Sequence, residues 1–152
     1  MSYQSHADLG GRLGYGRVVP EPEGELFHAT WEPRVLALTL AMGATGSWNI
    51  DMSRAARETL PDYAQLSYYE IWTQALEKLL LERGLLQPGE AEAGAATAGP
   101  HPPLPRVLAA ADVPAVLARG SPTARPGPAP VFAVGDTVRL RSGAVPHHTR
   151  LP

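Results

Sequence analysis

The sequence predicts a mainly α-helical protein that works as part of an assembly. Complete helix signals are concentrated between residues 66 and 84, core-forming side chains are confined to residues 25–86, and one strand-like run stands alone near the end of the chain. We therefore divide the chain into an extended arm (1–24), a small helical domain (25–86), a Pro/Ala-rich linker with a short helix (87–130), and a strand with a tail that docks on a partner subunit (131–152).

The strongest helix signal begins at Ser67. Ser67 and Glu70 have the spacing of a capping box, and Gly84 supplies the left-handed residue that ends a helix, so we expect a helix from about 68 to 83. Apolar side chains cover more than half of its circumference, which exceeds what a helix packed on one side needs. Two interpretations remain open: a central core helix, or a helix that also contacts another protein.

The arm and the first helix precede this element. The arm (1–24) contains five glycines and almost no periodicity, so it cannot build a core of its own and either dangles or lies on something. Thr30 is the expected N-cap of a helix from Trp31 to about Met42, which Gly43 is expected to stop.

A second, short helix is expected before the long one. Either Asn49 or Asp51 has the side chain to cap it, and the pattern ends at about Leu60. Pro61 then opens a turn. Three or four helices are therefore expected between residues 30 and 86.

The linker and the strand differ sharply in composition from the helical domain. Residues 87–130 hold ten prolines, twelve alanines and five glycines, with a short helix possible from Asp112 to Arg119. Residues 131–141 alternate like a strand. Since a lone strand leaves its backbone groups unpaired, we expect a partner chain to complete the sheet. The alternative is an ordinary edge strand or a frayed tail.

Composition excludes several classes of function. The net charge of −2 provides no electrostatic surface for nucleic acid or an anionic membrane. There is no cysteine, hence no disulfide or thiolate metal site, and the five histidines lack metal-ligand spacing. Without an 18-residue apolar run or a signal-peptide pattern, a cytoplasmic protein is expected.

Three charged residues share one face of the short helix. Arg54, Arg57 and Glu58 stand at positions i, i+3 and i+4. Such a group is usually a solvated ion pair of little consequence. At a buried interface, however, Arg54 would be a permanently charged fork suited to an oxyanion.

Six segments in a characteristic order carry a family resemblance. They are Asp8 to Gly16, Phe27-His28 with Trp31-Glu32, Asp51 to Arg54, Ser67-Tyr68-Tyr69 with Trp72, Val134 to Val138, and His148-Thr149-Arg150. Read together, they resemble the β subunit of nitrile hydratase over nearly the whole chain. Because the family continues past the last segment into a small SH3-like barrel, we expect the N-terminal half of a split β subunit, as in three-subunit nitrile hydratases such as the toyocamycin type.

The resemblance implies a hydro-lyase that hydrates a nitrile to an amide. Its metal, cobalt(III) or iron(III), would be held by a partner α subunit through a claw of partly oxidised cysteines, and this chain would bind none. By motif, Arg54 and Arg150 would donate hydrogen bonds to the oxidised sulfurs, Tyr68 would bond to the metal-binding loop, and Glu58 would relay protons. Arg57 is a further candidate beside them. Cobalt is favoured because three-chain relatives use it.

The substrate pocket implied by the resemblance departs from some relatives. Thr39 and Ser53 stand where those relatives have aromatic rings, with Trp48 and Ile50 nearby. Short hydroxyl side chains open volume and add hydrogen-bonding groups. We therefore expect a bulky, polar, heteroaromatic nitrile as the substrate.

Three alternatives compete with this interpretation. A metal-insertion activator (chaperone) of nitrile hydratases shares the pattern of the long helix, but lacks the glycine-rich arm, the Gly135-Asp136 segment and Arg150. A thiocyanate hydrolase subunit would be split similarly, although residues 132–150 match it less well. A non-catalytic interaction module would tolerate the change Arg54→Lys.

Overall fold

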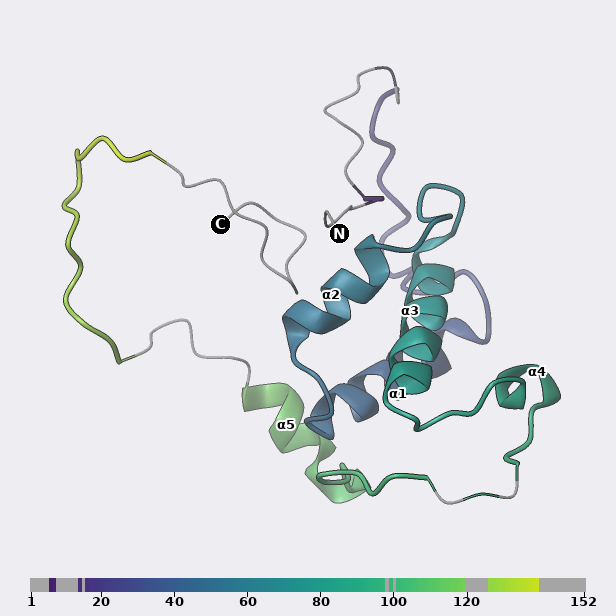
Figure 1. The fold of residues 1–152 in the computed structure, drawn as a ribbon. Coiled ribbons are helices and arrows are strands. Elements are labelled where there is room, and N and C mark those ends of the chain that lie inside the picture. The colour runs from purple at the N-terminus through teal and green to yellow at the C-terminus, as the bar shows by residue number, and fades with distance from the viewer. Residues whose placement is uncertain are drawn as a thin grey trace.

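The computed structural model describes residues 6–7, 14, 16–97, 99, 101–119 and 126–139. This part of the chain is mainly helical and contains no strand (Figure 1). Its elements are α1 (Glu32–Ala44), α2 (Ile50–Glu58), α3 (Tyr68–Glu82), α4 (Glu90–Ala93), the 3-10 helix η1 (Ala110–Asp112) and α5 (Val113–Arg119). The expected helical domain is thus built from three helices, α1 to α3.

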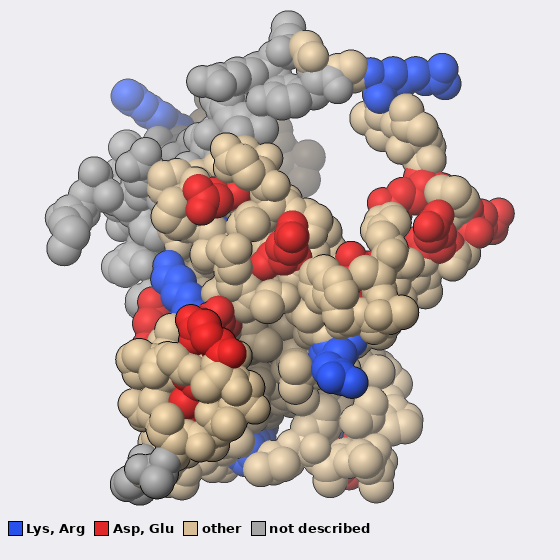
Figure 2. All heavy atoms as spheres, turned by 90° about the vertical axis from the view of Figure 1, so that its right-hand side faces the viewer, with Lys and Arg blue, Asp and Glu red and all other residues tan. Residues whose placement is uncertain are grey.

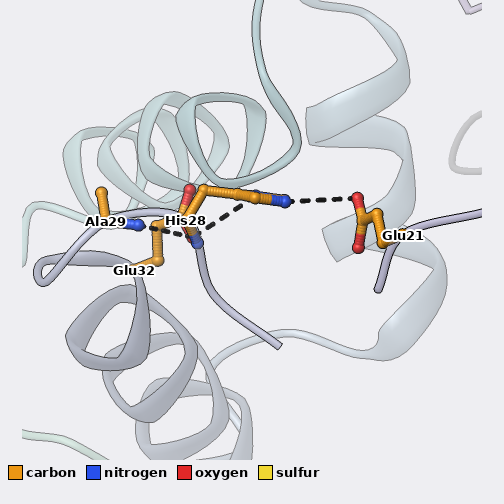
Figure 3. Close-up of polar contacts among 4 residues, drawn as sticks. All are labelled: Glu21, His28, Ala29 and Glu32. Atoms are coloured by element: carbon orange, nitrogen blue, oxygen red, sulfur yellow. Dashed lines mark hydrogen bonds and ion pairs between the residues drawn. The ribbon is translucent and has the colours of Figure 1, made fainter. Parts of the chain in front are cut away.

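Helix α1 begins with a carboxylate that reaches backward. Glu32, buried in the first turn, accepts hydrogen bonds from the amide of His28 at 2.6 Å and that of Ala29 at 3.4 Å (Figure 3). The His28 ring also lies 3.4 Å from the carboxylate of Glu21. The prediction that Thr30 caps this helix is wrong: Trp31 occupies the N-cap position, and Glu32 satisfies free amides in its place.

The end of α1 also differs from the expectation. Gly43 does not stop the helix but lies within it, with a helical backbone and not a left-handed one. The break comes at Thr45, whose hydroxyl donates to the carbonyl of Met42 at 2.6 Å, and at Gly46, which has φ +79°. Helix α1 therefore runs two residues past its expected end, to Ala44.

Helices α2 and α3 follow their local signals. Of the two candidate caps of α2, Asn49 is the one used, and its side chain accepts from the amide of Met52 at 2.9 Å. The capping box of α3 forms, with the amide of Ser67 donating to Glu70 at 2.7 Å. Gly84 (φ +66°) closes α3.

The core is small and is centred on α3, which packs against both α1 and α2. Its buried apolar side chains come from the turn before α2, from α2 and the residues just after it, and from α3: Trp48, Ala56, Leu60, Ala75 and Leu79. The arm touches this unit, since the amides of His6 and Ala7 donate to the carbonyl of Glu58 at 2.8 and 3.2 Å.

Past α3 the chain returns to the helical domain. Buried Glu90 at the start of α4 accepts from the amides of Gln87 and Thr97 at 2.7 and 2.5 Å. Further on, Arg106 donates through Nε to the carbonyl of Ala44 at the end of α1, at 2.5 Å. The short helix expected near residues 112–119 is present as α5, beside the junction of α1 and α2 (Figure 1).

The strand expected over residues 131–141 is not formed in its described part, residues 131–139. Instead, the amide of Ala133 donates to the Asp136 carboxylate at 2.8 Å, and the amide of Asp136 donates to the Ala133 carbonyl at 3.2 Å, around Gly135 with φ +102°. The physical reason is that a strand requires a ladder partner, and none of the described residues is a strand.

On the face shown in Figure 2, acidic side chains are scattered among uncharged ones and the basic side chains lie apart from one another, with no continuous basic patch. Among the described helices, none has the length and apolar character required to cross a bilayer.

Candidate functional site

A pocket of about 320 Å³ lies at the meeting point of α1, α2, α3 and α5. It gathers side chains that are far apart in the sequence. The lining residues are Thr39, Leu40, Gly43, Ala44, Trp48, Asn49, Ile50, Ser53, Arg57, Trp72 and Val116. All four side chains predicted to bind substrate are therefore neighbours around one hollow, although their role in binding stays a prediction.

These four residues line the pocket in different ways. Thr39, Trp48 and Ser53 are buried, whereas Ile50 is 61% exposed and so lies at the edge of the pocket. The Thr39 hydroxyl is buried and finds no hydrogen-bond partner among the described residues. An unpaired buried hydroxyl costs free energy, and a bound molecule that hydrogen-bonds to it would offset that cost.

Among the described residues, Arg57 is the one charged side chain in the pocket lining. Its Nη2 donates to the hydroxyl of Ser53 at 2.9 Å, one turn earlier on α2. Its guanidinium carbon lies 4.0 Å from the centre of the Trp72 ring on α3, a cation–π contact. The Nε atom of the same guanidinium is buried without a partner among the described residues.

Three of the predicted catalytic residues lie close enough to Arg57 to affect its pKa. Burial lowers the pKa of the Arg57 guanidinium, Tyr68 raises it, Arg54 lowers it and Glu58 raises it. An arginine stays protonated despite such shifts. Arg54, Glu58 and Tyr68 thus share the neighbourhood of Arg57, with Arg54 exposed and Glu58 half-buried.

An aromatic cluster flanks this neighbourhood. Tyr68 and Trp72 lie with ring centres 5.5 Å apart, and Tyr69 lies 5.1 Å from Tyr68 and 5.6 Å from Phe27. Burial raises the pKa of the Tyr69 hydroxyl. Tyr68 is nevertheless 64% exposed, so its hydroxyl-bearing ring is available to a partner.

The position of Arg150 lies outside the described residues. Within the described residues, no group of three histidine, aspartate or glutamate side chains is arranged to hold a metal ion. The polar side chains that line the pocket are the Arg57 guanidinium, the Thr39 and Ser53 hydroxyls and the Asn49 amide, whose oxygen accepts from the amide of Met52. Such groups suit a negatively charged oxygen or a ring acceptor.

Sequence reasoning named Arg57 only as a further candidate and did not place it in the pocket. The available signal was its i, i+4 spacing from Ser53 on a short helix. Trp72 and Val116 were not predicted as lining residues. They enter the pocket through the packing of α3 and α5, which no local pattern encodes.

Comparison with known proteins identifies the family of the chain. Residues 3–113 match the family described as nitrile hydratase beta subunit, N-terminal. The chain is 35% identical to the low-molecular weight cobalt-containing nitrile hydratase subunit beta of Rhodococcus rhodochrous, over 94% of this chain and 67% of that protein. It is 37% identical to the nitrile hydratase subunit beta of Pseudomonas putida, over 95% and 66%.

A third relative, the nitrile hydratase subunit beta of Rhodococcus erythropolis, is 32% identical over 95% of this chain and 65% of its own length. The chain therefore spans about two thirds of the length of these relatives. The family match over residues 3–113 includes helices α1 to α3, which form most of the pocket. The chain belongs to the nitrile hydratase β-subunit family.

Proposed function

We propose that this chain is a subunit of a nitrile hydratase that converts a bulky heteroaromatic nitrile to its amide. The observation that carries the proposal is the pocket itself, in which Thr39, Trp48, Ile50 and Ser53 surround a hollow next to Arg57. A pocket with aromatic walls and few polar groups suits a flat, partly polar molecule.

The proposal divides the chemistry between chains. Cobalt(III) or iron(III), held by the α subunit, would polarise the nitrile carbon toward attack by water. This chain would supply hydrogen-bond donors: Arg54 and Arg150 to oxidised sulfur oxygens of the α subunit, and Tyr68 to its metal-binding loop. The exposure of Arg54 and Tyr68 supports this role, because both are free to meet a partner.

An α subunit is the first expected partner, and exposed apolar side chains support a docking surface for it. Leu38, Leu40, Ile50 and Tyr68 are each more than 40% exposed on or beside the helices that form the pocket. Exposed apolar groups of this kind mark contact surfaces when they are contiguous with a site. A further subunit that carries an SH3-like barrel, and a cytoplasmic location, remain predictions.

The subunit is favoured over the metal-insertion activator for one reason. The family match begins at residue 3 and so includes the arm, which the activator was expected to lack. The third alternative, a non-catalytic interaction module, is distinguished from the subunit by the activity of the Arg54→Lys variant.

The test is co-expression of this chain with candidate α subunits, followed by native mass spectrometry and a nitrile hydration assay. We expect a stable, metal-bearing particle that forms amide from two-ring heteroaromatic nitriles faster than from acrylonitrile. Transient exchange with the α subunit would support the activator instead. Turnover of thiocyanate in place of nitriles would support thiocyanate hydrolase.

A further inference from the structure

Two buried polar atoms in the pocket are left without partners. They are Nε of Arg57 and the hydroxyl oxygen of Thr39, and neither forms a hydrogen bond with the described residues. Both residues line the same 320 Å³ hollow, Thr39 from α1 and Arg57 from α2. Buried polar groups are nearly always satisfied in native proteins, so two in one pocket indicate a missing acceptor.

The Arg57 guanidinium is held at two points, which restrict the orientation of its unpaired Nε. Nη2 donates to Ser53 at 2.9 Å, and the guanidinium lies over the Trp72 ring at 4.0 Å. Because the guanidinium is planar and rigid, holding it by Nη2 and by one face also sets the direction of the Nε–H, the one unpaired Arg57 donor atom that is buried. The arginine is thus preorganised before any ligand arrives.

No carboxylate lies within ion-pair distance of Arg57 in the described part of the chain, where the ion pairs involve histidines only, and Glu58 acts on it from further away. A half-buried cation without a counter-ion favours a ligand that brings electron density to it. A ring nitrogen or a carbonyl oxygen provides that density, while a hydrocarbon ring of equal size does not.

The rest of the lining restricts the shape of the ligand. Trp48 and Trp72 present aromatic surfaces, and Leu40, Ile50 and Val116 are apolar. Aromatic side chains favour stacked or edge contacts with flat rings. A planar ring with one hydrogen-bond acceptor therefore matches both the walls and the free donor.

We propose that Arg57 is a specificity-determining residue, whose Nε donates to an acceptor atom on the ring of the substrate, with the Thr39 hydroxyl as a second polar contact. The inference rests on the proposed function for the identity of the substrate as a nitrile. It adds that a fused heteroaromatic nitrile is selected over its hydrocarbon analogue by this one guanidinium.

The test uses the assembled complex and ligands matched in size. Quinoline-3-, quinoline-6- and quinoline-7-carbonitrile place a ring nitrogen at three distances from the cyano group, and naphthalene-2-carbonitrile has none. Wild type, Arg57→Met, Thr39→Val and the control Arg34→Met, an exposed arginine on α1, are compared for kcat/KM. Isothermal titration with the corresponding carboxamides measures binding without turnover.

We expect at least one quinoline isomer to be preferred over naphthalene in the wild type. Arg57→Met should reduce that preference by about 10- to 100-fold, in kcat/KM and in affinity, as expected for loss of a charged hydrogen bond. Thr39→Val should reduce it less, and Arg34→Met should leave it unchanged. If Arg57→Met does not fold, Arg57→Gln, which retains a shorter polar group, is expected to reduce the preference in the same direction.

Equal preference in wild type and Arg57→Met for all three isomers, by both measurements, would overturn the inference. If nitriles are hydrated without dependence on Arg57, the inference fails and the proposed function stands. If carboxamides bind with this dependence but no nitrile is hydrated, the inference stands and the proposed function fails.

Discussion

The guanidinium carbon of Arg57 lies 4.0 Å from the centre of the Trp72 ring, which joins α2 to α3 at the pocket. The two residues are separated along the chain by the Pro61 turn and the capping box of α3. The contact therefore depends on both helices being in place, and it links the stability of the fold to the geometry of the pocket.

A double-mutant cycle measures this link. Arg57→Met and Trp72→Leu should each lower the free energy of unfolding, and the double variant should lose less than the sum. The expected coupling is about 0.5–1 kcal/mol, typical of a partly exposed cation–π pair. Urea titrations of the purified protein provide the four free energies. A coupling of zero would mean that the contact contributes nothing to stability.

Arg54→Lys tests the role proposed for the exposed arginine of α2. Lysine keeps the charge but cannot form the two-pronged hydrogen bond of a guanidinium. We expect nitrile hydration by the complex to fall by about a hundredfold, as when a donor to a developing charge is removed. Because Arg54 is exposed, the complex should still assemble, which native mass spectrometry checks.

The matched control is Arg34→Lys on α1, where activity should be unchanged. Full activity of Arg54→Lys would instead agree with a non-catalytic interaction module.

Glu90 is expected to make the segment around α4 sensitive to acid. The amides of Gln87 and Thr97, with the Thr97 hydroxyl, lower the pKa of the Glu90 carboxyl to about 2. Because the folded pKa lies below the ordinary value of 4.5, the stabilisation is complete above pH 4.5 and is lost as the pH falls toward 2.

Hydrogen exchange of the Gln87 and Thr97 amides measures this effect. Protection in the wild type should exceed that in Glu90→Gln at pH 7, and the difference should shrink by pH 3. Exposed Glu92, two residues further along α4, provides the control Glu92→Gln, which should retain wild-type protection. A difference that persists unchanged at pH 3 would contradict the assignment.

Two glycines with different backbone conformations should respond oppositely to alanine. Gly84 has φ +66° at the end of α3, and an added Cβ would meet Pro102 only at ordinary contact distance, 3.9 Å. Gly84→Ala should therefore destabilise the protein through backbone strain alone, by about 1–2 kcal/mol.

Gly43 is helical in α1, and a Cβ there would meet nothing within 4 Å. Gly43→Ala should stabilise by about 0.5–1 kcal/mol. Urea unfolding of both variants checks the signs. Stabilisation by both substitutions would show that the left-handed turn after α3 is not required.

The long helix shows how far local signals reach. Its capping box and its terminal glycine were predicted and are observed, because each involves residues within a few positions of one another. The same reasoning failed for α1. Glycine is the residue type that often ends a helix, but Gly43 does not end α1. The break depends on the Thr45 hydroxyl and on Gly46, where an added Cβ would lie 3.8 Å from the Arg106 guanidinium.

The sequence by itself determined the three helices of the helical domain and indicated the family, because helix caps and ordered motifs are encoded by near neighbours along the chain, whereas the short helix α4 was not predicted. Only the tertiary structure decided that Arg57 lines a pocket with its Nε unpaired. That outcome depends on how α1, α2, α3 and α5 pack, and residues as distant as Thr39 and Val116 meet there. The expected strand did not form in residues 131–139 for a related reason, since its pairing requires a strand that the described part of the chain does not provide.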